Sequence, residues 1–129
     1  MSTTKFVTHP DGVHQPPGNA FSHAVVAGGL VHTSGQVGMS PDGLLLDGFE
    51  GQAKQAFENL KVVLGACGAG LADVVKVNVL VAETADVRKY LPIAAKYLAH
   101  RPASTLHAVK AFAMPGLLFE VDAVAVLPR

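Results

Sequence analysis

Apolar residues are spaced along this chain in two ways, one typical of strands and one typical of helices. Short apolar runs of strand length occupy residues 23–26, 30–34, 74–82, 104–112 and 117–127. Two other segments repeat apolar residues every three or four positions, as the buried side of a helix does. The first begins near Asp47 and carries Ala53, Phe57, Leu60, Leu64 and Cys67; the second follows Thr84 and carries Val87, Leu91, Ala94 or Ala95, and Leu98. The pattern predicts the order β-β-α-β-α-β-β.

Turn and cap residues separate these elements. Gly28-Gly29 predicts a tight hairpin between the first two strands. Asp47, with an acidic residue three positions later, fits a loose capping box for the first helix, and Thr84 can cap the second. Pro92 lies inside the second helical pattern and is expected to kink it. Residues 1–17 contain several Pro and Gly and predict an extended lead-in to a single domain spanning 1–129.

The alternation in residues 74–82 assigns the two faces of the central strand. Val75, Val77, Val79 and Val81 share one face, and Lys76 and Asn78 lie on the other. This predicts an α+β fold, a mixed sheet with two helices packed on one face. The second face has little chain left to cover it. Charged residues make up 16% of the chain, against about 25% in typical soluble domains. Both features favour self-association, and the alternative is a small monomer with few charges.

Charge and composition argue against several classes of partner. Ten Lys+Arg balance ten Asp+Glu without a basic stripe, which argues against nucleic acid as a ligand. No segment approaches the roughly 18 apolar residues of a membrane span. No signal peptide is recognisable, so a cytoplasmic location is the default expectation. The six histidines and single cysteine lack metal-ligand spacing, so no metal or other cofactor is expected.

Candidate chemistry lies on the last strand and beside the hairpin. Glu120 and Asp122 share one side of a largely apolar strand. A carboxyl in such surroundings has a raised pKa and can transfer protons. The alternative is that one of the two faces solvent at a strand end. Ser34 precedes Gly35 and can present its hydroxyl together with the Gly35 backbone amide. His107, on the neighbouring strand, either faces a pocket or is an ordinary sheet residue.

Four segments together resemble the Rid family (YjgF-type, with the older label endoribonuclease L-PSP). They are AVVAGGLVHTSGQVG at 24–38, QAKQAFENLKVVLGACGAGLADVVKVNVLV at 52–81, RPAS at 101–104 and FEVDAVAV at 119–126. The resemblance extends from about residue 18 to residue 126. It implies a chorismate-mutase-like fold that assembles as a homotrimer, with a small-molecule pocket in each subunit cleft.

The resemblance also implies an activity and a set of site residues. Well-studied members hydrolyse enamines and imines derived from amino acids to a keto acid and ammonia. Their site combines a tyrosine near the hairpin, the serine of SGQ, an arginine directly after RPA and a glutamate in the last strand. Ser34 and Glu120 match as catalytic residues. The expected substrate-binding residues are Phe21, at the tyrosine position, Ser104, at the arginine position, and Gly35, Thr105 and His107.

The serine at position 104 changes the expected substrate. A bidentate arginine–carboxylate pair is a strong, directional interaction, and a serine cannot supply it. Arg101 could replace that arginine only along a different backbone path. We therefore expect hydrolytic deamination of an atypical small enamine or imine, such as a 2-aminomuconate-like ring-cleavage product. The alternative is a non-catalytic trimer that binds a small metabolite. Neutral net charge, the lack of Trp and the lack of an acid–base histidine pair argue against a ribonuclease.

Overall fold

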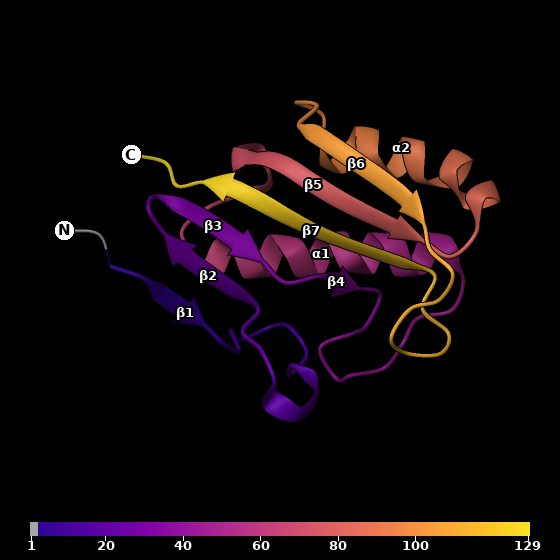
Figure 1. The fold of residues 1–129 in the computed structure, drawn as a ribbon, viewed down its shortest axis with the longest axis horizontal. Coiled ribbons are helices and arrows are strands. Elements are labelled where there is room, and N and C mark those ends of the chain that lie inside the picture. Colours follow the sequence, from indigo (N-terminus) through magenta and orange to yellow (C-terminus); the bar gives the residue numbers. More distant parts are fainter. Residues whose placement is uncertain (1–2) are drawn as a thin grey trace.

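The computed structural model describes residues 3–129 and has the predicted α+β architecture (Figure 1). Within these residues the strands are β1 (Lys5–Val7), β2 (Ala24–Ala27), β3 (Leu30–Thr33), β4 (Gln36–Val37), β5 (Val74–Val81), β6 (Ala103–Ala108) and β7 (Phe119–Val126). The α-helices are α1 (Phe49–Ala66) and α2 (Val87–Tyr97). Both lie on the same side of the sheet, behind it in Figure 1. Neither helix is long and apolar enough to cross a membrane.

The last strand of the chain, β7, lies inside the sheet. The strand order is β1-β2-β3-β7-β5-β6, and β4 pairs with β7 beyond the end of β3. All pairings are antiparallel except that of β5 with β6, so the sheet is mixed as predicted. The β2–β3 hairpin turns through Gly28 and Gly29, both at positive φ (59° and 79°), as a tight turn of this twist requires. The predicted hairpin is confirmed.

The main core lies between the sheet and the helices. The α1 stripe is buried as predicted, with Phe57 fully buried at its centre. The Phe57 ring lies 5.8 Å from Phe119 of β7 and 6.4 Å from Tyr90 of α2, measured between ring centroids. These three aromatic rings join both helices to the central strand. Burial also raises the pKa of the Tyr90 hydroxyl to about 12, so the group stays uncharged.

The N-terminal segment is more than the predicted lead-in. Residues 5–7 form strand β1, which pairs antiparallel with β2, and Val13 and His14 are buried. Residues 1 and 2 of the predicted lead-in lie outside the described residues. The Pro- and Gly-rich composition did not predict that this segment is packed, because the burial of the segment depends on contacts with distant parts of the chain.

Both predicted helix caps are wrong. Helix α1 has Gly48 at its N-cap, without a side-chain cap bond, so Asp47 does not cap it. The second helix is preceded by a 3₁₀ turn at Thr84–Asp86, and no side chain caps it either. The predicted stripe of α2 is also shifted: Leu91 is 58% exposed, whereas Tyr90 is buried. Tyr90 and Leu91 are consecutive residues of the same helix, and Tyr90 is the one that packs into the aromatic core.

Two strands depart from the predicted pattern. A β-bulge between Val74 and Lys76 turns Val75 outward, so Val75 is 46% exposed and Val74 is buried in its place. The predicted strand 104–112 ends at residue 108, and the chain from there to β7 forms a loop. The two-residue strand β4 was not predicted because two residues carry no detectable alternation. Alternation in β7 is as predicted, with Glu120 and Asp122 on the side away from the helices.

Candidate active site

Glu120 lines a small cavity on the sheet face that the helices leave open. The cavity has a volume of about 270 Å³, below the roughly 300–1,000 Å³ of pockets for drug-sized ligands. Its lining comes from the N-terminal segment, the β3–β4 region, the loop before β7 and β7 itself: His14, Pro17, Phe21, Gly35, Val37, Met39, Ala113, Met114, Leu117 and Glu120. Three of the predicted site residues, Phe21, Gly35 and Glu120, therefore come together.

The Glu120 carboxylate occupies a largely apolar environment. Its neighbours in sequence, Phe119 and Val121, are buried in the helix-side core, so the strand alternation directs Glu120 to the opposite face. In the sheet, Glu120 lies opposite Val37 of β4. Burial raises the pKa of the Glu120 carboxyl, and the negative charge of Asp122 raises it further. A carboxyl with a raised pKa holds a proton more readily than an ordinary glutamate, so it is suited to accept a proton and return it.

Gln52 of α1 fixes one wall of this cavity. Its side-chain amide donates hydrogen bonds of 3.0 Å to the carbonyl oxygens of Leu46 and Gly116, and its oxygen accepts one of 2.8 Å from the Leu118 amide. Gln52 itself is buried, whereas its partners Leu46, Gly116 and Leu118 are partly or fully exposed. They connect the helix to the two loops that lie side by side at one end of the sheet in Figure 1.

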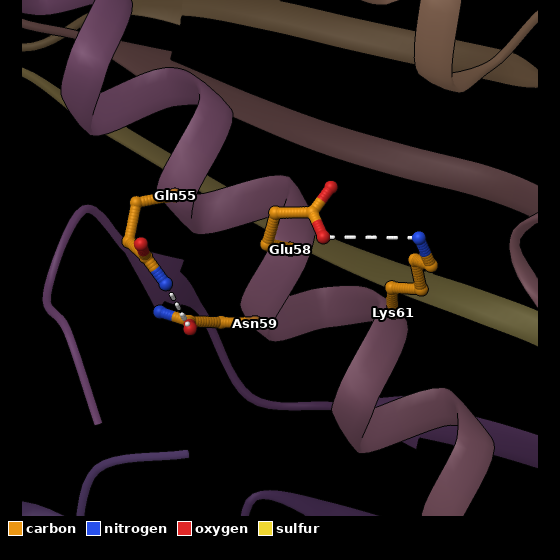
Figure 2. Close-up of polar contacts among 4 residues, drawn as sticks. All are labelled: Gln55, Glu58, Asn59 and Lys61. Carbon is orange, nitrogen blue, oxygen red and sulfur yellow. Dashed lines mark hydrogen bonds and ion pairs between the residues drawn. The ribbon is translucent and has the colours of Figure 1, made fainter. Parts of the chain in front are cut away.

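Asn59, two turns further along α1, fixes a second wall. Its amide nitrogen donates to the carbonyl oxygens of Val37 and Met39, at 3.0 and 2.8 Å. Its oxygen accepts a 2.8 Å bond from Gln55, as Figure 2 shows. The exposed ion pair also drawn in Figure 2 lies on a part of α1 that faces solvent. Neither amide was among the predicted site residues, and the sequence marks them only as two polar residues seven positions apart beside an apolar stripe.

Ser34 borders the site without lining the cavity. Its hydroxyl donates a 2.5 Å hydrogen bond to the Ser22 carbonyl, and its amide donates to the His23 carbonyl at 2.8 Å. Since the hydroxyl proton is used in this way, Ser34 is left as a hydrogen-bond acceptor. The sequence predicted that the Ser34 hydroxyl and the Gly35 amide face a ligand together. Of the two residues, Gly35 lines the cavity and Ser34 does not.

Ser104 lies in a different part of the same chain. It lines a cavity of about 230 Å³ beside α2, together with Arg101 and Pro102 and with apolar side chains of α2 and β5. Arg101 has a positive φ of 58°, which is uncommon for a residue other than glycine. This cavity shares no lining residue with the cavity of Glu120. Within one chain, the predicted partners Ser104 and Glu120 are therefore separate.

Thr105 and Asp122 lie on the open sheet face, where neighbouring strands hold both of them. Lys76 donates a 2.7 Å hydrogen bond to the Thr105 hydroxyl oxygen. Asn78 donates a 2.9 Å bond to the Asp122 carboxylate. These contacts account for two polar positions of this face without a ligand.

His107 is also on the open face but does not line the cavity. It pairs with Leu80 of β5, and Leu80 pairs with Glu120 of β7. Two strand spacings, about 10 Å in total, therefore separate the backbones of His107 and Glu120. His107 is exposed to solvent. In one chain it lies on the same face as the acid but apart from it.

His14 lines the cavity and was not among the predicted site residues. It is only 5% exposed, although it lies in an irregular segment. Burial lowers the pKa of its imidazole, and the neighbouring His23 and His9 lower it further. No sequence signal marks this residue, because its position depends on the packing of the N-terminal segment against β2 and β4.

Two other features bear on the chemistry of the site. Within residues 3–129, no group of three or more His, Cys, Asp or Glu side chains is arranged to hold a metal ion. The single thiol, Cys67, follows α1 and packs against the main core. Burial raises its pKa, with a smaller opposing effect from Lys5, which favours the unreactive thiol form.

The chain is similar in sequence and in fold to several known proteins. The model of the family described as Endoribonuclease L-PSP matches residues 13–127. The chain is 36% identical to the 2-iminobutanoate/2-iminopropanoate deaminase of Rattus norvegicus, over 83% of this chain and 80% of that protein. It is 35% identical to Protein HMF1 of Saccharomyces cerevisiae, over 82% and 83% of the two chains. The crystal structure of RidA from an Antarctic Psychrobacter superposes with a TM-score of 0.83 at 32% identity, covering 95% of this chain and all of that one.

Proposed function

Because the chain belongs to the Rid (YjgF-type) family, whose model is described as endoribonuclease L-PSP, we propose that it hydrolytically deaminates a small reactive enamine or imine in the Glu120 cavity. The family includes imine deaminases, as the name of the rat relative states. The observation that carries the proposal is the raised pKa of a carboxyl inside a small, mainly apolar cavity. The volume suits a metabolite of a few non-hydrogen atoms.

Glu120 provides the proton transfers that hydrolysis of a C=N bond needs. The carboxylate takes a proton from water while the water oxygen bonds to the imine carbon. The π electron pair moves to nitrogen, which takes that proton and gives a carbinolamine. Glu120 then removes the hydroxyl proton, the C–N pair leaves with nitrogen, and the proton passes to the departing ammonia. The net reaction converts an imine and water into a carbonyl compound and ammonia, and leaves Glu120 unchanged.

A second copy of the chain completes the proposed pocket. Ser104, which matches the family's arginine position, lines a cavity remote from Glu120 in its own chain. The open sheet face carries the exposed Val126, and Phe21 at the cavity is 45% exposed. Packing of these surfaces in a homotrimer would bring Ser104 of one copy towards Glu120 of the next. Arg101 borders the same cavity as Ser104 and would enter the cleft with it.

The second candidate is a trimer that binds a metabolite without converting it. Two observations favour it. The ten residues that line the Glu120 cavity include neither Lys nor Arg, so no side chain there neutralises a substrate carboxylate. The Ser34 hydroxyl also donates its proton to the Ser22 carbonyl, so it cannot donate to a ligand. Both leave fewer groups for stabilising a transition state.

Ammonia release from the purified protein tests the proposal. The substrates are 2-iminopropanoate and 2-iminobutanoate, generated in situ, and a 2-aminomuconate-type enamine. We expect turnover by the wild type and a loss of about 100-fold or more in Glu120→Gln. Glu58→Gln, the same change at an exposed site on α1, is the matched control and should retain wild-type turnover. Equal rates in wild type and Glu120→Gln would reject the mechanism, whereas binding without turnover across the panel would select the second candidate.

A further inference from the structure

We propose that His14 makes a second direct polar contact with the ligand in the Glu120 cavity, and that His9, His23 and Gln36 hold it in place for this contact. The inference rests on the proposed function only in taking this cavity as the ligand site. His14 and Glu120 are the ionisable side chains among the cavity-lining residues.

The His14 side chain has hydrogen-bonding capacity that the chain leaves unused. Its imidazole Nδ1 is buried and has no hydrogen-bond partner among the described residues. Leaving a buried polar atom unpaired destabilises a fold, and such groups in native proteins call for a specific explanation. The His14 ring lines the cavity, and a rotation of the ring that turns Nδ1 towards the cavity would let a ligand satisfy this atom.

Two other histidines fix the backbone on which His14 sits. His9 donates through Nε2 to the carbonyl of Val13 at 2.9 Å, and His23 donates through Nε2 to the carbonyl of His14 at 2.7 Å. The His14 and His23 rings meet edge to face, with centroids 5.1 Å apart and an interplanar angle of 89°. An irregular segment is thus held at two consecutive carbonyls, which gives the His14 ring a defined position.

His23 is already fully engaged, so it cannot take the same role. Because its Nε2 must carry the proton donated to the His14 carbonyl, the neutral ring presents an acceptor at Nδ1. The Gln36 side-chain amide donates to that atom at 3.0 Å. Both nitrogens of His23 are therefore used inside the protein. Of the two buried histidines, only His14 has a ring nitrogen left for a ligand.

The charge state of His14 limits which contact it makes. Burial lowers the pKa of its imidazole, and the nearby His23 and His9 act in the same direction. Burial likewise lowers the pKa of His23. A neutral His14 offers one N–H donor and one acceptor, and it does not repel a protonated C=N group. The cavity thus presents a carboxyl and a neutral imidazole within apolar walls, which suits a small imine or enamine that carries an N–H group.

His14→Phe separates a ligand contact from a purely structural role. Phenylalanine keeps a ring of similar shape against His23 and removes both nitrogens. We expect the dissociation constant for the product-like probe 2-oxobutanoate to rise about tenfold, as for the loss of one hydrogen bond. The unliganded protein should keep its melting temperature or gain up to about 5 °C, because an unpaired buried nitrogen disappears. His14→Asn retains a polar atom on a shorter side chain and should recover part of the affinity.

The two measurements also distinguish failure of this inference from failure of the proposed function. Unchanged probe affinity in His14→Phe would overturn the inference even if the enzyme is active. If the wild type neither binds 2-oxobutanoate nor releases ammonia from any imine, the proposed function fails and the melting temperatures alone decide. A His14→Phe protein that is clearly less stable than wild type would then overturn the inference, because the ring nitrogens must be satisfied within the protein. An equal or higher melting temperature would support it.

Discussion

The carboxylate of Glu120 lies directly against the backbone of Gly35. A Cβ atom built on Gly35 would be 2.5 Å from Glu120 Oε2 and 2.6 Å from its carboxyl carbon, closer than non-bonded atoms can approach. Only glycine lets the β3–β4 segment and the carboxyl of β7 share this space. The close approach also explains why a serine–glycine pair at a strand end belongs to this site although Ser34 itself points elsewhere.

Gly35→Ala should therefore displace the Glu120 carboxylate. The contact is with the end of a flexible side chain, so we expect the carboxylate to rotate away and the fold to survive. Ammonia release should fall at least tenfold, because a misplaced general base loses most of its contribution. Gly65→Ala is the matched control: Gly65 lies in α1 with open space around its Cα, and alanine there should stabilise the protein by about 0.5–1 kcal/mol. Wild-type turnover in Gly35→Ala would contradict a catalytic Glu120.

The raised pKa of Glu120 gives the stability of the protein a specific pH dependence. Because the folded-state pKa is above the ordinary value of about 4.3, the folded protein binds more protons than the unfolded chain in the window between the two values. The contribution of Glu120 to stability is therefore fully present below about pH 4.3 and is lost as the pH rises through the folded-state pKa. Glu120→Gln removes this dependence.

Urea unfolding of wild type and Glu120→Gln at pH 4 and pH 7 measures the effect. The variant should be the more stable protein at pH 7, and its advantage should shrink at pH 4, where the wild-type carboxyl is protonated. An advantage that stays constant over this range would show that Glu120 titrates as an exposed carboxyl does, and would remove the physical basis of the proposed base.

Sequence patterns were sufficient where one side of an element is buried along its whole length. Alternation in β7 placed Glu120 on the open face, and the α1 stripe through Phe57 is buried as predicted. In α2 the same reasoning selected Leu91, whereas Tyr90 is the buried residue. Val87, Tyr90, Leu91 and Ala94 allow two apolar stripes on this helix, and only the packing of Tyr90 against Phe57 and Phe119 selects one. The bulge that turns Val75 outward is likewise not visible in the sequence pattern.

The candidate site was predictable only in part because loops distant in sequence build its walls. Glu120 and Gly35 belong to regular strands or their ends, and their positions followed from spacing. Met39, Met114 and His14 come from three irregular segments, and no local pattern predicts that they share a cavity. The loops of Met39 and Met114 are held by buried amides of α1, whose hydrogen bonds span up to 66 positions along the chain, and the segment of His14 is held by His9 and His23.

Gln52 should be among the most sensitive positions of the fold. Removing its side chain by Gln52→Ala breaks three partly buried hydrogen bonds, and the Gly116 carbonyl and the Leu118 amide each lose a partner. Since each hydrogen bond contributes about 0.5–1.5 kcal/mol, the free energy of unfolding should fall by about 1.5–4.5 kcal/mol. Lys54→Ala, at an exposed position of the same helix, should cost less than about 1 kcal/mol. Similar urea midpoints for the two variants would show that the Gln52 bonds do not hold the cavity walls.

The proposed trimer predicts that assembly through the open sheet face and activity are linked. Val124 and Val126 alternate along β7 on this face, and Val126 is exposed in the single chain. Val124→Asp would bury an unpaired charge in any interface formed there, which costs far more than it does at a free surface.

Sedimentation should give three times the mass of one chain for wild type, and the mass of one folded chain for the variant. Because the proposed pocket needs Ser104 from a neighbouring copy, the variant should also lose ligand binding. Lys61→Asp, on the exposed side of α1, should leave mass and binding unchanged. A wild-type protein that sediments as a single chain and still turns over an imine would show that one copy suffices.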